Sequence, residues 1–211
     1  MSSNISNESP FFTFMSKVGD LIYINILCIL FSLPIVTIGA SVTATYCTVS
    51  SLYKKEEKYV FRTFLAAFKS NFKNSTIIWV IMAVLGYMVA LYSSYISHHI
   101  NQIVALAIYM FVLMIYLFTL CYVFALQATF INNPFKLMVN AFLTAIARLP
   151  YTLGLSLITF MPALLTLLFP QYIFITSVFW VVIGFSLTSL IRVYLMRKAL
   201  KPYMNEETPE K

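Results

Sequence analysis

Charged residues are scarce in this chain and are missing altogether from two long stretches. Only 10% of the 211 residues are Asp, Glu, Lys or Arg, whereas 61% are hydrophobic. No charged residue occurs among the 62 residues between Lys73 and Lys136, or among the 43 residues between Arg148 and Arg192. One helical membrane crossing needs about 20 apolar residues, so each stretch is long enough for two crossings. This composition excludes an ordinary soluble globular protein.

Acidic residues are missing from the apolar segments. Asp20 is the only aspartate, and the glutamates all lie in tails or loops: Glu8, Glu56, Glu57, Glu206, Glu207 and Glu210. Proton-coupled transporters usually carry the proton on a carboxylate buried in the membrane. The sequence therefore argues against that mechanism.

Groups that bind metals or perform catalysis are also few. The three cysteines have no CxxC spacing, and the two histidines, His98 and His99, have no carboxylate or thiol close to them in the sequence. Neither a disulfide framework nor a metal site is therefore expected. The chain also lacks a recognisable set of nucleophile, base and orienting residue, and it has no Gly-rich phosphate loop. We expect neither an enzyme nor a cofactor.

The apolar segments predict an all-α, polytopic transmembrane helical bundle. Two hairpins are clear, and they pair segments 75–96 with 103–130 and segments 151–169 with 172–191. A short polar link joins the first pair, whereas little more than Pro170 and Gln171 separates the second pair, which indicates a very tight turn.

The first apolar segment, 21–52, is too long for one straight crossing and is interrupted by LPIVTIGAS at 33–41. Pro34 removes a helical hydrogen bond, and Gly39 permits a sharp change of direction. A full turn gives helices at about 14–33 and 40–53, six crossings and a cytoplasmic N-terminus. A mere kink gives five crossings and an N-terminus outside. We favour six crossings.

Polar residues at membrane depth concentrate around this break. Irregular backbone in a membrane occurs only where protein or water satisfies its freed polar groups, so the break is either packed against neighbouring helices or lines a cavity. Packing is the favoured interpretation. The candidate structural or ligand-facing residues are Asn25, Pro34, Thr37, Gly39, Ser41 and Thr45.

Amphipathic segments precede the hairpins. The spacing of Phe61, Phe64, Leu65, Phe68 and Phe72 places them on one helical face, as in a helix that lies in the membrane interface. Similar spacing begins at Phe135 and at Phe11. Basic residues flank these interfacial elbows and form a candidate docking surface: Lys58, Arg62, Lys69, Lys73 and Lys136.

These patterns predict a single membrane domain over 1–211. It contains a broken first hairpin (11–53), two units of elbow plus hairpin (59–130 and 133–201) and a polar tail (202–211). A true internal duplication of these units stays an open hypothesis.

The Lys and Arg residues predict the orientation. Nearly all of them lie on one side of the predicted crossings, which the positive-inside rule assigns to the cytoplasm together with the C-terminus. The net charge of +7 then matches anionic lipid headgroups rather than nucleic acid.

Two runs resemble a known family. NILCILFSLPIVTIGASVTATY (25–46) and FLAAFKSNFKNST (64–76) resemble the YesL-like family of uncharacterised bacterial integral membrane proteins. Many members have a tryptophan near the position of Cys28, and this chain does not. The resemblance implies a bacterial plasma-membrane protein, often found with carbohydrate uptake systems, and it carries no catalytic or ligand residue.

Two functions are therefore in view. The first is an accessory or regulatory partner of a carbohydrate transporter subunit, docked through the basic elbows. The alternative is a transporter of small solutes or lipids whose site lies at the broken first segment.

Overall fold

The computed structural model describes residues 10–54, 59–96, 102–130 and 133–204, and these residues form helices and no strand. η1 and η2 are short 3-10 helices, and η3 is a π-helix. The elements in chain order are α1 (Pro10–Ser32), η1 (Ile35–Thr37), α2 (Ile38–Lys54), α3 (Val60–Ile96), α4 (Gln102–Thr129), α5 (Pro134–Ala147), α6 (Leu149–Leu168), η2 (Pro170–Tyr172), α7 (Ile173–Phe179), η3 (Trp180–Gly184) and α8 (Phe185–Met204).

The helices are those of a multi-pass membrane protein. Five spans in the described part of the chain are long and apolar enough to cross a membrane, and the number rises to six if the bent pair α5 and α6 is counted as one span. The prediction of an all-α polytopic fold is confirmed.

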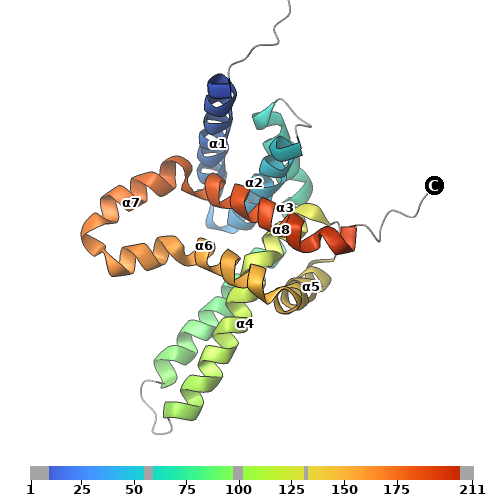
Figure 1. Cartoon of the computed structure of the whole chain (residues 1–211). Coiled ribbons are helices and arrows are strands. Elements are labelled where there is room, and N and C mark those ends of the chain that lie inside the picture. The colour runs from blue at the N-terminus through green and yellow to red at the C-terminus, as the bar shows by residue number, and fades with distance from the viewer. Residues whose placement is uncertain (1–9, 55–58, 97–101, 131–132, 205–211) are drawn as a thin grey trace, which may run out of the picture.

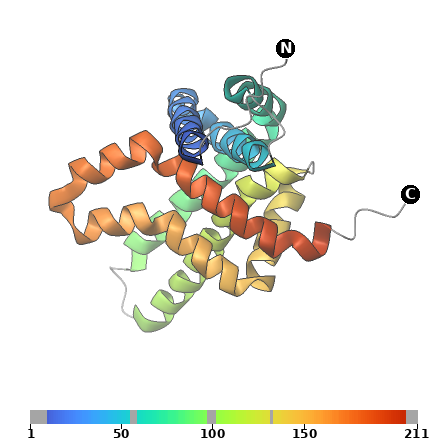
Figure 2. The ribbon, with the colours of Figure 1, turned by 45° about the horizontal axis from the view of Figure 1, so that its top comes forward.

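The helices do not run parallel as one compact bundle. Figure 1 shows α1 and α2 at one end, the α3–α4 hairpin at the opposite end and the α6–α7 hairpin extending to the side, and Figure 2 shows the same separation from another angle. The core lies where α1, α2, α3, α4 and α8 meet. Its largest fully buried side chains include Ile24, Phe64, Ile78, Met82 and Tyr122.

The first apolar segment turns back completely, as six crossings require. α1 ends at Ser32, and α2 begins at Ile38 and packs against α1. Each of the two segments, Phe14–Ser32 and Ile35–Lys54, is long enough to span a membrane on its own.

The predicted elbows differ from one another in the structure. α5 is a separate helix that meets α6 at a bend of 110°, where Pro150 follows the bend. α1 and α3, by contrast, each form one helix that includes both the elbow and the span. The expectation of a separate elbow at the start of each hairpin is wrong for α1 and α3, because no proline follows their amphipathic turns to end the helix.

The aromatic face of α3 also has a different partner from the one expected. Phe64 is fully buried, and the ring of Phe68 lies 5.0 Å from that of Phe31 on α1. Part of this face therefore packs on protein rather than on lipid. The spacing of apolar residues could not distinguish the two, because both partners are apolar.

Candidate functional site

The break between α1 and α2 is held by Thr37. Its hydroxyl donates hydrogen bonds to the carbonyl oxygens of Phe31, at 2.6 Å, and of Pro34, at 2.8 Å. Pro34 itself is exposed and has no N–H to donate. One side chain thus satisfies carbonyls that the interrupted helix leaves without a partner.

Gly39 serves close packing rather than a change of direction, which corrects our sequence prediction. It lies inside α2 and is buried. A Cβ atom at this position would lie 2.5 Å from the carbonyl oxygen of Ser75 and 2.6 Å from Cβ of Trp79. The glycine therefore lets α2 approach α3. Beside it, the Ser75 hydroxyl donates to Oγ1 of Thr43 at 2.9 Å.

The remaining residues of the break face the protein interior. Ser41 and Thr45 are buried, and the Thr45 hydroxyl donates to the Ser41 carbonyl one turn earlier at 2.9 Å. The Ser41 hydroxyl is buried and makes no hydrogen bond within the described residues. These positions agree with the packing interpretation of the break.

Asn25 acts on a different part of the chain. Its side chain is fully buried, and its amide nitrogen donates to the carbonyl oxygens of Trp180, at 3.1 Å, and Val181, at 2.5 Å. Its amide oxygen accepts the backbone N–H of Ser186 at 3.0 Å. These backbone groups belong to the π-helix η3 and to the turn after it, where the regular pattern of helical hydrogen bonds is interrupted. Asn25 therefore ties α1 to the last hairpin.

The sharp bend between α5 and α6 has its own hydroxyl. Thr152 is buried and donates to the carbonyl oxygens of Ala145, at 2.7 Å, and Arg148, at 3.1 Å. The hydroxyl of Tyr122 on α4 lies 3.1 Å from Oγ1 of Thr152. This bend therefore resembles the α1–α2 break in having a threonine that satisfies carbonyls across it.

Arg192 forms a polar centre of another kind. It extends from α8 toward two other helices and donates hydrogen bonds to the hydroxyls of Tyr46 on α2, at 2.6 Å, and Thr159 on α6, at 2.7 Å. The thiol of Cys121 on α4 donates to the same Thr159 oxygen at 3.7 Å. Four helices therefore meet around one guanidinium group, which we call the Arg192 centre: Tyr46, Cys121, Thr159 and Arg192.

The positive charge of this centre has no negative partner in the described part of the chain. Asp20 on α1 is the one carboxylate that the structure describes, and no ion pair joins it to Arg192. The Nε atom of Arg192 is buried without a hydrogen-bond partner. Tyr46 is the central residue of α2, and Thr159 lies in the middle of α6, so the guanidinium contacts both helices far from their ends. An ionised residue in such a place is costly and usually functional.

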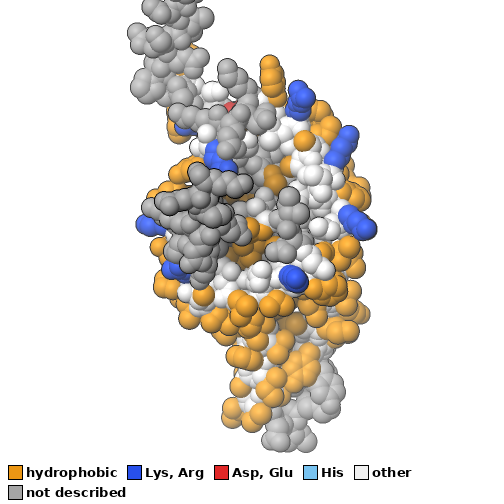
Figure 3. Space-filling view, turned by 90° about the vertical axis from the view of Figure 1, so that its right-hand side faces the viewer, with side chains coloured by type: hydrophobic (Ala, Val, Ile, Leu, Met, Phe, Trp, Pro, Cys, Tyr) orange, Lys and Arg blue, Asp and Glu red, His pale blue; other side chains and the backbone are white. Residues whose placement is uncertain are grey.

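The predicted docking residues are on the surface. Arg62, Lys69 and Lys73 on α3 and Lys136 on α5 are exposed, whereas Lys58 lies outside the described residues. On the face shown in Figure 3, Lys and Arg side chains lie over the wide part of the molecule and are missing from the described surface of the α3–α4 hairpin. This one-sided distribution is the pattern on which the predicted orientation rests.

The sequence analysis did not identify the Arg192 centre. We treated Arg192 as one of the basic residues that mark the cytoplasmic side, but its side chain is directed into the protein. A signal was present, because four apolar or aromatic residues separate Arg192 from the basic pair Arg197 and Lys198 in the run RVYLMRK.

Comparison with known proteins gives one similarity. A family model described as "Protein of unknown function, DUF624" matches residues 21–93, which cover most of α1, the break, α2 and most of α3. Asn25 and Tyr46 lie inside this match, whereas Cys121, Thr159 and Arg192 lie beyond it. No curated protein and no solved structure matches the chain.

Proposed function

We propose that this protein is an accessory, non-enzymatic subunit of the bacterial plasma membrane that binds the transmembrane part of a carbohydrate uptake system. The YesL-like resemblance of segments 25–46 and 64–76 suggests the kind of partner. The structure contributes a surface on which such a partner could dock.

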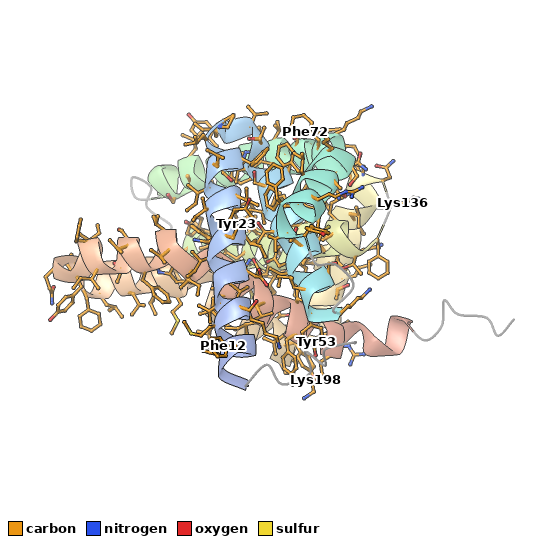
Figure 4. All side chains as sticks on the ribbon, turned by 90° about the horizontal axis from the view of Figure 1, so that it is seen from above. Phe12, Tyr23, Tyr53, Phe72, Lys136 and Lys198 are labelled. Atoms are coloured by element: carbon orange, nitrogen blue, oxygen red, sulfur yellow. The ribbon has the colours of Figure 1, made fainter. Side chains whose placement is uncertain are left out.

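The observation that carries the proposal is the exposure of the α6–α7 hairpin. α7 contacts chiefly α6 and the two short helices beside it, η2 and η3. Figure 4 shows this hairpin extending away from α1, α2 and α3. Its outward side chains are large and apolar, and Phe174 is 78% exposed. A hairpin that stands apart in the membrane offers apolar surface to the helices of another membrane protein.

The broken first segment supports the alternative, a transporter, less well. Gly39, Thr43 and Thr45 are used in helix packing and helix hydrogen bonds. We therefore do not propose the break as a transport site.

A crosslinking experiment tests the docking surface. A photoreactive benzoylphenylalanine replaces Phe174 on α7 or, as a matched control, Phe111 on α4, which is 59% exposed. After irradiation of intact bacteria, we expect the α7 variant to crosslink to the membrane subunit of a carbohydrate transporter. The α4 variant should not. Recovery of the α7 variant without a transporter subunit would contradict the proposal.

The proposed orientation, with both termini in the cytoplasm, has a separate test. A cysteine at Ser3, in a chain without the native cysteines, should not react with an impermeant thiol reagent in intact cells. The predicted reason is the one-sided distribution of Lys and Arg. Labelling at Ser3 would favour five crossings.

A further inference from the structure

An apolar groove runs between α4 and α6. These helices cross near the centre of the molecule and then leave it in different directions, as Figure 1 shows. The groove has a volume of about 350 Å³, within the range of roughly 300–1,000 Å³ typical of ligand sites. Most of its walls are methionine, leucine and phenylalanine, including Met110, Met114, Phe118, Leu157, Phe160 and Met161.

The inner end of this groove adjoins the Arg192 centre. On α4, Phe118 precedes Cys121 by one helical turn, and on α6 the groove residues Ser156 and Phe160 lie on either side of Thr159. Thr159 in turn accepts hydrogen bonds from Cys121 and Arg192. An apolar channel and an uncompensated cation are thus neighbours along the same two helices.

The Arg192 centre has donors that its own hydrogen bonds leave unused. Nε of Arg192 has no partner. The Tyr46 hydroxyl accepts the bond from Arg192, and its own proton has no acceptor in the described part of the structure. The Thr159 hydroxyl, by contrast, already donates to the Leu155 carbonyl at 2.6 Å. The centre therefore offers a guanidinium N–H and a phenolic O–H to an incoming oxygen anion.

We propose that the protein binds a long-chain fatty acid, with its carboxylate at Arg192 and its hydrocarbon chain in the α4–α6 groove. The planar guanidinium matches a carboxylate, and their hydrogen bonds are strengthened by charge. A carboxylate also supplies the negative charge that the described residues do not provide. The apolar groove fits one hydrocarbon chain and no polar ligand of similar length.

Oleate binding to the purified full chain in mild detergent tests this assignment. Arg192→Gln removes the cation, and Tyr46→Phe removes the phenolic donor. We expect Arg192→Gln to weaken oleate binding by at least about tenfold, because a hydrogen bond to a charged group is lost. Tyr46→Phe should weaken it by a smaller factor. Arg62→Gln, which removes an exposed arginine from α3, should leave binding unchanged.

The groove has an independent test that keeps the cation. Leu157→Trp fills the groove and should abolish or strongly weaken oleate binding. Leu143→Trp makes the same change at an exposed position on α5 and should have no effect. These variants and Tyr46→Phe decide the question if Arg192→Gln is not recovered as folded protein.

Three results would overturn the proposal. The first is no binding of oleate to the parent chain. The second is binding that neither the Arg192 centre variants nor Leu157→Trp reduce. The third is displacement of oleate by inorganic phosphate or phosphatidylglycerol at lower concentrations than unlabelled oleate needs, because the ligand would then be a phosphate group and not a fatty acid.

Discussion

The π-helix η3 and the Arg192 centre are both polar features of the last apolar span, yet they differ in how completely they are hydrogen bonded. At η3, the side chain of Asn25 makes three hydrogen bonds to backbone groups of the irregular helix and its flank. At Arg192, a charged group has two hydroxyl partners and a buried Nε without one. A satisfied polar group stabilises a fold, whereas an unsatisfied charge costs stability and points to binding. The predictions below test this difference.

The largest expected effect is at Asn25. Asn25→Leu leaves two carbonyls and one N–H of the last hairpin buried without partners, each at a cost of about 1–3 kcal/mol. We expect a loss of at least about 3 kcal/mol of stability and a low yield of monodisperse protein in detergent. Asn140→Leu makes the same change at an exposed position of α5 and should melt like the parent chain.

The second effect concerns the contact of α2 with α3. Gly39→Ala places a Cβ against the Ser75 backbone and should cost about 1–3 kcal/mol through overpacking. Gly19→Ala in α1 has no atom within 4 Å of the new Cβ and should be neutral or stabilising. Thermal unfolding of the two variants measures the difference. Equal melting temperatures would mean that the close approach of the helices does not matter.

A smaller effect is expected at the two threonines that satisfy carbonyls across helix breaks. Thr37→Val and Thr152→Val remove hydroxyls that donate to Phe31 and Ala145, respectively, and each should cost about 1–2 kcal/mol. Thr176→Val removes a hydroxyl that donates only within its own short stretch of helix and should cost less. If all three variants melt together, the breaks do not depend on these hydroxyls.

The sequence was enough to predict the helices and their hairpins. Pro34 and Pro170 mark the two turns, and long uncharged runs mark the spans, because both signals are local. The candidate break was also found correctly as a region where polar residues gather.

The contacts between distant parts of the chain could not be predicted in this way. The Asn25 side chain meets Ser186, which is 161 positions away, and no pattern along α1 indicates that partner. The role of Gly39 depends on where Ser75 and Trp79 lie, and the role of Arg192 depends on Tyr46 and Thr159. A helical pattern shows which face is apolar or polar, but not which helix covers it.

The most direct test of the account compares Arg192→Met with Asn25→Leu in thermal unfolding of the ligand-free protein. Removing a buried charge without a negative partner is often neutral or stabilising, so we expect Arg192→Met to melt within a few degrees of the parent chain, on the order of 1 kcal/mol. Asn25→Leu should melt far lower. If Arg192→Met is destabilised as strongly as Asn25→Leu, the Arg192 centre is a structural element and the distinction drawn between the two regions is wrong.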